Sequence, residues 1–305
     1  MDCEGKRGGF RLTTLILFLA VLAALVWQGN IADRDLAPIT GVKEFAGLRM
    51  DKETLTLPPA ADWNFIVYGD VRWGGRVQLG LPLAALPAKP AFLVCMGDMV
   101  DMGTPEQLAA YAKLVAPIAK QVPFYHLAGN HDLAPAFLRD YEKPYESIFG
   151  RRYYAITRGT WTILFLDTAL GWFDHDQRLW IDQQLATLPP KQNLILATHE
   201  PPVDPRPTGE HAMLPWGVWQ FEDIVAKHPV KLILASHIHD EVTGEWQGIP
   251  LWICGEKSVT WRGTEPGYYL QVHVHGENFR VERVAVKTAP AGAPAEPAGP
   301  PGKDD

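Results

Sequence analysis

Polar residues of the kinds that bind metal ions follow a series of short apolar runs along this sequence. The set comprises Asp70, Asp98, Asp101, Asn130, His131, Asp132, His199, His237 and His239. Their carboxylate, amide and imidazole groups, with no thiolate among them, suit Mn, Fe, Zn or similar ions. Two such ions held close together activate water and stabilise developing negative charge. The residue types therefore favour hydrolytic chemistry at a two-metal site.

The apolar runs that precede these residues have the length and composition of β-strands. They are "NFIVYGD", "FLVCMGD", "VPFYHLAGN", "WTILFLD", "NLILATH" and "KLILASH". In α/β sheets, ligand sites gather outside the carboxyl ends of the strands, so five of these runs would deliver their polar residues to one edge. A single Asp or Asn after a strand is often a cap or a turn residue, so the site is inferred from the joint pattern.

Helical patterns lie between several of the predicted strands. Residues 104–121 have apolar side chains at helical spacing, with Thr104 as the N-cap. Pro117 is expected to kink or divide this helix, because proline removes a backbone hydrogen bond. Asp174 caps a second helix, which ends at a proline pair. The alternation indicates an α/β fold with largely parallel strands.

The last part of the folded region has a different pattern. Residues 267–286 alternate between apolar and polar with period two, around a turn near Gly276. This pattern predicts an antiparallel hairpin. The sheet system is therefore expected to be mixed.

Five short motifs, in this order, resemble the signature of calcineurin-like metallophosphoesterases: "GDVRW", "GDMVDMG", "GNHD", "THEPP" and "SHIHD". They span residues 64–240, and the family commonly has Gly where the last motif has Ser236. The resemblance implies a four-layer α/β/β/α sandwich with mixed sheets. It also implies an enzyme that hydrolyses phosphate esters at a dinuclear metal site, with monoesters and diesters both open.

The resemblance further implies which residues bind two divalent ions, with Mn, Fe and Zn the leading candidates. The ligands would be Asp70 and His239 for one ion, and Asn130, His199 and His237 for the other, with Asp98 bridging both. A water molecule shared between the ions becomes hydroxide near neutral pH, and this metal-bound hydroxide would attack phosphorus in line.

The motif "GNHD" adds residues that are expected to act beside the ions. By the family pattern, His131 would stabilise the transferring phosphoryl group or protonate the departing oxygen. Asp132 could orient the imidazole of His131. Asp101 is expected to support its loop as a hydrogen-bond acceptor rather than bind a metal.

The first motif departs from the family pattern, because Arg72 stands where a histidine ligand of the first ion is usual. In one interpretation, that ion binds with fewer protein ligands and an extra water. In a second, its site is weak or empty, and Arg72 supplies positive charge in its place. In a third interpretation, Arg72 is an ordinary surface residue. We favour an Arg72 that faces the phosphate beside a retained but altered site, since arginine can grip two phosphate oxygens. The alternative function is a non-catalytic or single-metal protein that binds phospho-ligands.

The segment 201–221, "PPVDPRPTGEHAMLPWGVWQF", is expected to be a long loop beside the metal site. Such a loop is often a lid or a binding surface. Trp216 and Trp219 in this segment are weak candidates for substrate binding, by stacking on a base or contacting a lipid chain. Packing of the loop onto the domain is the more common role of such residues.

The N-terminal part contains a run without charged residues between Arg11 and Asp33. Residues 12–32 would span about 30 Å as a helix, which suffices to cross a bilayer. Basic residues precede the run and acidic residues follow it, so residues 1–11 are expected in the cytoplasm. The prediction is a single-pass anchor with the catalytic domain on the extracytoplasmic side. Secretion after signal cleavage is the alternative.

The rest of the chain divides into a connector at 33–60, a metallophosphoesterase domain at 61–287 and a Pro/Ala/Gly-rich disordered tail at 288–305. The net charge of −7 argues against a nucleic-acid-binding surface. The expected partner is a phosphate-ester substrate. A membrane anchor favours a lipid-linked or envelope-derived ester as that substrate. The oligomeric state is left open.

Overall fold

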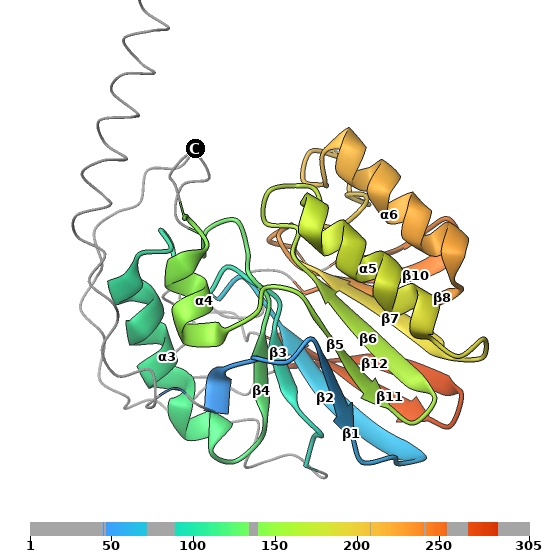
Figure 1. Ribbon diagram of the computed structural model, residues 1–305, viewed down its shortest axis with the longest axis horizontal. Coiled ribbons are helices and arrows are strands. Elements are labelled where there is room, and N and C mark those ends of the chain that lie inside the picture. The colour runs from blue at the N-terminus through green and yellow to red at the C-terminus, as the bar shows by residue number, and fades with distance from the viewer. Residues whose placement is uncertain are drawn as a thin grey trace, which may run out of the picture.

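Figure 1 shows a computed structural model of the chain, which describes residues 45, 47–71, 89–133, 140–207, 209–240, 242–254 and 268–285. Three features predicted from the sequence lie outside the described residues: the span at 12–32, Arg72 and the tail at 288–305. None of the helices in the described ranges combines the length and apolar character that a membrane crossing requires.

The described strands form two sheets, one of seven strands and one of five. In order across the larger sheet they are β1 (Thr54–Leu57), β5 (Tyr154–Arg158), β6 (Trp161–Leu166), β7 (Asn193–Thr198), β8 (Val230–Ala235), β10 (Ile249–Ile253) and β9 (Thr243–Trp246). In order across the smaller sheet they are β12 (Asn278–Ala285), β11 (Tyr268–His275), β2 (Asp62–Tyr68), β3 (Leu93–Cys95) and β4 (Phe124–His126).

Both sheets combine parallel and antiparallel pairs, so the predicted mixed sheets are confirmed. In the larger sheet, β6, β7 and β8 are parallel, whereas β5 pairs with β6 in the antiparallel sense. In the smaller sheet, β2, β3 and β4 are parallel, and β11 joins β2 and β12 in antiparallel pairs. The hairpin of β11 and β12 turns at Gly276, whose φ of 58° is readily adopted by glycine.

The described helices cover the outer faces of the two sheets. They are α3 (Pro105–Ala119), α4 (Lys143–Phe149), α5 (His175–Thr187) and α6 (Pro215–Lys227). Figure 1 shows α3 and α4 together on the side of the smaller sheet, and α5 and α6 together on the side of the larger one. The layers therefore run from helices through two sheets to helices.

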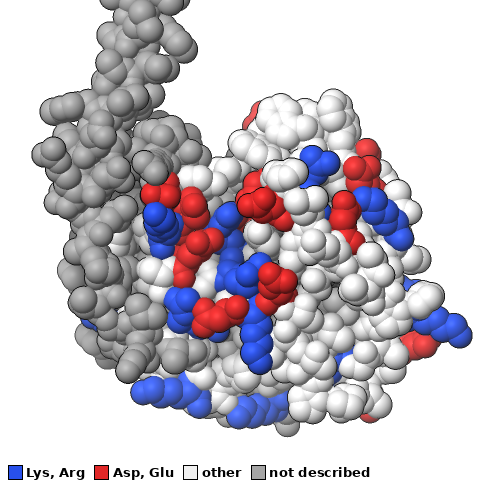
Figure 2. Space-filling model, viewed as in Figure 1, with Lys and Arg blue, Asp and Glu red and all other residues white. Residues whose placement is uncertain are grey.

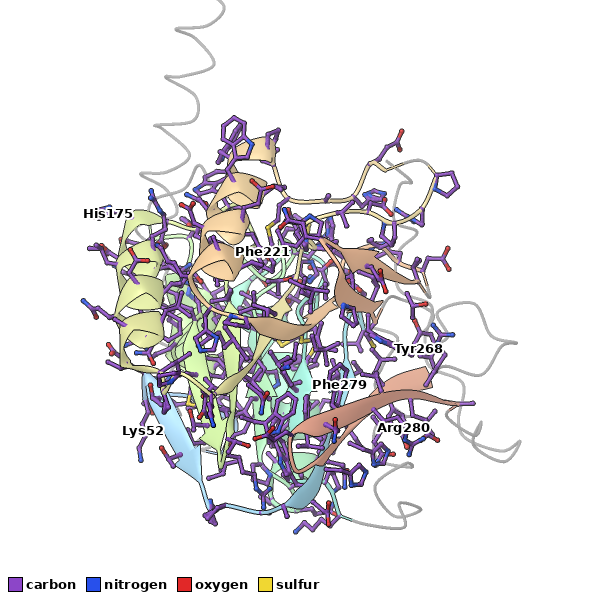
Figure 3. All side chains as sticks on the ribbon, turned by 90° about the vertical axis from the view of Figure 1, so that its right-hand side faces the viewer. Lys52, His175, Phe221, Tyr268, Phe279 and Arg280 are labelled. Carbon is purple, nitrogen blue, oxygen red and sulfur yellow. The ribbon has the colours of Figure 1, made fainter. Side chains whose placement is uncertain are left out.

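The burial pattern of β6 explains this layering. Ile163 and Phe165 belong to the apolar cluster that the two sheets share, whereas Leu164 and Leu166 belong to a second cluster with α5 and α6. Neighbouring side chains of a strand point to opposite faces, so a strand between two layers must be apolar throughout. Phe221 of α6 is fully buried in the second cluster (Figure 3).

The predicted helix starts are confirmed at both caps. The side chain of Thr104 accepts a hydrogen bond from the amide of Gln107 at 3.3 Å, and Asp174 accepts one from the amide of Gln177 at 2.8 Å. Pro117 does not divide the first helix, because it lies in the last turn of α3. A proline so close to the end disturbs few of the helix's hydrogen bonds.

The prediction of a loop over residues 201–221 is wrong for residues 215–221. Helix α6 starts at Pro215, a residue whose fixed φ suits the first helical position. Phe221 and Ile224 then recur at helical spacing and are buried against the sheet. The prolines and glycines upstream obscured this short amphipathic pattern.

Charged side chains of both signs intermingle on the face shown in Figure 2.

One surface hollow of about 330 Å³ is lined by Arg49, Asp51, Glu146, Gly150, Arg151, Arg152 and Tyr153. Arg49 pairs with Asp51 at 2.7 Å, and Arg152 pairs with Glu146 at 3.1 Å. Because its arginines already have carboxylate partners, this hollow is a poor candidate for a phosphate site.

Candidate metal centre

The predicted metal ligands lie at the carboxyl ends of strands from both sheets. Asp70, Asp98 and Asn130 follow β2, β3 and β4 of the smaller sheet. His199 and His237 follow β7 and β8 of the larger sheet. The sequence pattern alone predicts a single edge, whereas the structure builds the site where the ends of two sheets meet.

Five of the predicted ligands form two overlapping groups, and within each group the ligand atoms lie within 4.8 Å of one another. The first group is Asp98, His199 and His237, and the second is Asp70, Asp98 and His239. Asp98 is shared by both groups and fully buried, which is the arrangement expected of a carboxylate that bridges two ions. Asn130 adjoins the first group, since its Oδ1 lies 3.0 Å from Nε2 of His199.

The ring of His199 is held in the tautomer that a metal ligand needs. Its Nδ1 lies 2.8 Å from the carbonyl oxygen of Met96, and a carbonyl can only accept, so Nδ1 carries the proton. In the neutral ring, Nε2 then presents a lone pair, 3.3 Å from Oδ1 of Asp98. A lone pair facing carboxylate and amide oxygens is favourable when a cation lies among them.

His237 is also suited to binding a cation. Burial, followed by the nearby ring of His199, lowers the pKa of His237 to about 3, so the imidazole is neutral at physiological pH. Its Nδ1 is buried and has no hydrogen-bond partner within the described part of the chain. A neutral imidazole nitrogen is the form that coordinates metals.

Asp70 is fixed by donors from the segment that follows β8. The hydroxyl of Ser236 donates to Oδ2 of Asp70, and the amide of His237 donates to the same oxygen at 3.0 Å. The Oδ1 atom lies 3.8 Å from Nε2 of His239. The carboxylate is thus oriented by the larger sheet although the smaller sheet carries it.

The backbone of the ligand residues adopts a rarely populated conformation. Among the described non-glycine residues, positive φ occurs at Asp70, Asp98, Asp140, His237, His239 and Gln247. Two-thirds of these residues are predicted ligands, with φ between 50° and 70°. Each such residue costs of order 1–3 kcal/mol, which the surrounding structure must offset, and such strain clusters at functional sites.

These observations fit divalent metal ions. Asp70 and Asp98 are both buried, and their ligand atoms lie in one group, so their charges need compensation by cations. Carboxylate and imidazole donors match Mn, Fe or Zn. The backbone of Gly129 packs directly against Asp98 of the first group. A Cβ atom on Gly129 would collide with the carboxylate and the amide of Asp98.

His131 adjoins the ligand cluster without belonging to either group. Its amide donates to Oδ1 of Asp98 at 3.1 Å, and its Nδ1 lies 2.8 Å from the carbonyl oxygen of Asp101. That carbonyl requires a proton on Nδ1, so Nε2 is the nitrogen that bears the lone pair in the neutral ring. The orienting contact of this imidazole therefore comes from the backbone of Asp101.

Asp132 has a different place from the one expected. It is fully buried, and its Oδ1 accepts the amides of Met99 and Val100 at 2.7 and 3.1 Å. Its Oδ2 accepts the amide of Gly129 at 2.8 Å. Burial, together with the charge of Asp98, raises the pKa of this carboxyl group well above its usual range. Asp132 thus orders the loops that carry Asp98 and His131, rather than the ring of His131 as we expected.

Two residues within the quoted motifs were missed as contributors. Ser236, in "SHIHD", supplies the donor to Asp70 described above. Glu200, in "THEPP", is half-buried, and burial followed by the charges of Asp98 and Asp167 raises the pKa of its carboxyl group to about 8. The departure of Ser236 from the common Gly was the available signal for the first, and nothing local marked the second.

The remaining predicted site residues are Arg72, Trp216 and Trp219. Arg72 lies outside the described residues, so its role stays a prediction. Trp216 and Trp219 lie on α6 with 47% and 65% of their surface exposed. Trp216 contacts Trp172, with 6.0 Å between the ring centroids.

The fold and the shared-carboxylate ligand groups define a metallophosphoesterase-type centre. A family model described as calcineurin-like phosphoesterase matches residues 64–241, more than half of the chain. The chain belongs to this family.

Curated relatives carry the names of phosphodiesterases. The chain is 27% identical over 198 residues to the 3',5'-cyclic adenosine monophosphate phosphodiesterase CpdA of Escherichia coli (61% of this chain, 64% of that protein). It is 29% identical over 176 residues to a probable glycerophosphodiester phosphodiesterase of Arcobacter nitrofigilis (54% and 62%). It is 30% identical over 222 residues to a cAMP/cGMP dual specificity phosphodiesterase of Mycobacterium tuberculosis (64% and 65%). The chain thus matches less than two-thirds of the length of these relatives.

Solved structures support the fold. A dimetal phosphatase from Danio rerio has a TM-score of 0.54 at 13% identity, covering 74% of this chain and 99% of that one. GAP50 of Plasmodium, titled as the anchor in the inner membrane complex, has a TM-score of 0.52 at 11% identity, covering 75% and 90%. At these identities the likeness concerns the fold alone.

Proposed function

We propose that this protein is a metal-dependent hydrolase of phosphate esters with a dinuclear site. The observation that carries the proposal is the pair of ligand groups that share the buried carboxylate of Asp98. Phosphodiesters are the favoured substrate class, because the curated relatives are named for phosphodiester substrates.

In this proposal, Asp70 and His239 would hold one ion, Asn130, His199 and His237 would hold the other, and Asp98 would contribute to both. When bound, such ions act as Lewis acids and supply hydroxide as the attacking nucleophile near neutral pH. The protein supplies preorganised ligands: His199 is fixed by the carbonyl of Met96, and Asp70 by Ser236. Preorganisation matters because the ligands need not rearrange as charge develops.

The chain's own contribution beside the ions is the imidazole of His131. The Asp101 carbonyl holds the proton on Nδ1, so Nε2 bears a lone pair in the neutral ring and needs a second proton before it can donate to an oxygen of the ester. A protonated ring would donate from Nε2 to the phosphoryl group or to the departing oxygen. Arg72 is proposed to face the phosphate, where its guanidinium would grip two oxygens.

A specific observation keeps a second function open: a single-metal or non-catalytic protein that binds phospho-ligands. The ion beside Asp70 lacks the usual histidine, and Oδ2 of Asp70 is already engaged by Ser236 and the amide of His237. Elemental analysis distinguishes the two functions. Two ions per chain with turnover supports the hydrolase, whereas one ion or fewer without turnover supports the binding protein.

We also propose that residues 12–32 anchor the chain in a membrane with the catalytic domain outside the cytoplasm, secretion after cleavage being the alternative. The charge-free run and its basic flank support this topology. A lipid-linked or envelope-derived ester would then be within reach. Extraction of membranes with alkaline carbonate tests the anchor, because a spanning protein stays in the pellet and a released domain does not.

The hydrolase proposal is tested by stripping the full chain of metals, restoring them singly, and assaying a chromogenic phosphodiester beside the matching monoester. Metal-stimulated turnover that is lost in Asn130→Ala supports the proposal. Equal turnover of the stripped, restored and variant proteins contradicts it. The ratio of diester to monoester turnover assigns the substrate class.

A further inference from the structure

A second imidazole, besides that of His131, lies beside the ligand cluster. His211 belongs to the segment between β7 and α6, and its side chain is exposed. Its ring packs edge-to-face on the ring of His237, with 5.6 Å between the centroids and 86° between the planes. His211 is not a member of either ligand group within the described residues. A ligand bound next to His237 would therefore meet this imidazole.

The position of His211 is fixed by a buried carboxylate. Asp204 is 5% exposed, and its Oδ2 accepts the amide of His211 at 3.1 Å. The same carboxylate accepts the amide of Arg206 at 3.0 Å and its guanidinium at 2.8 Å. Although burial acts in the opposite direction, the hydrogen bonds from Arg206 and His211 lower the pKa of Asp204 to about 2. We call Asp204, Arg206 and His211 the clasp.

The clasp is tied directly to the loop that carries two of the metal ligands. Nη1 of Arg206 donates to the carbonyl oxygen of Ile238 at 2.9 Å. Ile238 lies between His237 and His239, whose backbones both have positive φ. Arg206 thus joins the ligand loop to Asp204, and Asp204 accepts the amide of His211. Hydrogen bonds therefore fix the position of His211 relative to the ligands.

We propose that His211 contacts the substrate by hydrogen-bonding an oxygen of the phosphate ester, with Asp204 and Arg206 as positioning residues. This inference rests on the proposed hydrolase function and adds a residue to its site. His131 follows a strand of the smaller sheet and His211 follows a strand of the larger one. The two imidazoles thus reach the ester from different sheets.

A purely structural role makes a different demand on this side chain. A ring that only supports His237 needs an aromatic edge or face, which phenylalanine also provides. A ring that contacts the ester needs a nitrogen, which glutamine replaces in part. His211→Phe and His211→Gln therefore separate the two roles. His175→Phe is a matched control, because His175 is an exposed histidine at the start of α5 (Figure 3).

The test measures kcat and KM for a chromogenic phosphodiester, metal content, and calorimetric binding of inorganic phosphate to the metal-loaded full chain. We expect His211→Phe and His211→Ala to lower kcat/KM by about 10- to 100-fold and to weaken phosphate binding, because a hydrogen bond to a charged group is lost. His211→Gln should lose less. Metal content should stay at the wild-type value in all variants, and His175→Phe should match the wild type.

Two results would overturn the proposal. In the first, every His211 variant keeps kcat/KM and phosphate affinity within about twofold of the wild type. In the second, His211→Phe keeps both properties while His211→Gln loses bound metal, which assigns the ring to support of His237. If the wild type shows no turnover, the hydrolase function fails, and the phosphate titration alone decides the role of His211.

The positioning part of the proposal has its own variant. Asp204→Ala removes the acceptor of the His211 amide, so we expect a loss of kcat/KM similar to that of His211→Ala. The double variant Asp204→Ala/His211→Ala should have a kcat/KM only slightly below that of either single variant, since both changes remove the same interaction. Fully additive losses would show that Asp204 does not act through His211.

Discussion

The hydroxyl group of Ser236 donates a hydrogen bond to the carboxylate of Asp70. The two residues come from different sheets, and both are buried. Ser236 lies where calcineurin-like phosphoesterases commonly have Gly. In the proposed site, Asp70 would serve the ion whose usual histidine is replaced by Arg72. Both departures from the family motifs therefore concern the same ion.

Replacement of Ser236 by alanine should lower the affinity of the protein for the ion proposed to lie beside Asp70 and His239. The donor that orients Asp70 is lost, and removal of such outer partners typically costs about 10- to 100-fold in metal affinity. The ion held by His199 and His237 should be retained. Elemental analysis during stepwise dialysis against a chelator measures both affinities. Ser236→Thr, which keeps the hydroxyl, is the control, and equal metal loss in Ala and Thr variants would refute this role of Ser236.

Replacement of Asp132 by alanine should lower both stability and turnover. Three buried amides, those of Met99, Val100 and Gly129, lose their acceptor. Each unsatisfied group costs about 1–3 kcal/mol, so the free energy of unfolding should fall by several kcal/mol. Urea denaturation at neutral pH measures the change.

Asp101→Ala is the matched control for Asp132→Ala. It keeps the backbone carbonyl that holds Nδ1 of His131, so turnover should remain near that of the wild type. If Asp101→Ala is as damaging as Asp132→Ala, the backbone contact does not explain how His131 is oriented.

His126 should make the protein sensitive to acid. The residue is 2% exposed among aromatic rings, and burial lowers its pKa from 6.5 to about 3. The unfolded chain takes up a proton near pH 6.5, whereas the folded chain does so only near pH 3. The stability linked to His126 is thus fully present above pH 6.5 and is lost as the pH falls toward 3, by a few kcal/mol in all.

The measurement is the free energy of unfolding of the metal-free protein at several pH values between 7 and 3.5. His126→Phe should flatten the curve, because the aromatic packing remains and the titrating group is gone. The buried His237 contributes in the same direction and leaves a residual slope. His175→Phe should keep the full slope. An unchanged slope in His126→Phe would show that this histidine does not titrate with folding.

Much of the fold and of the ligand set could be predicted from the sequence, because both are visible in local patterns. Strands such as β7 are buried on both faces and therefore appear as unbroken apolar runs. Asp98 and His199 follow such runs directly. The caps at Thr104 and Asp174 depend on neighbours a few residues away, so the local sequence predicts them. The hydrogen bonds of both side chains confirm the prediction.

The features that were missed depend on contacts between residues far apart in the chain. Ser236 meets Asp70 across 166 positions, so the departure from Gly marks the position of Ser236 in the motif but does not identify Asp70 as its partner. The ring of His131 is held by a backbone carbonyl, which every residue type offers, so the sequence could not predict that Asp101 contacts this ring. His211 lies against His237 only because the segment before α6 folds over the ligand loop.

The most direct test of the proposed function is the metal content and phosphodiester turnover of Asp98→Asn beside the wild-type chain. Asp98 is the residue that the two ligand groups share, so its loss should affect both ions. The account predicts two ions per wild-type chain and metal-dependent turnover. In Asp98→Asn it predicts loss of bound metal and a fall in kcat of about a thousandfold or more, as the nucleophile is no longer activated. Retention of metal and of turnover in Asp98→Asn would contradict it.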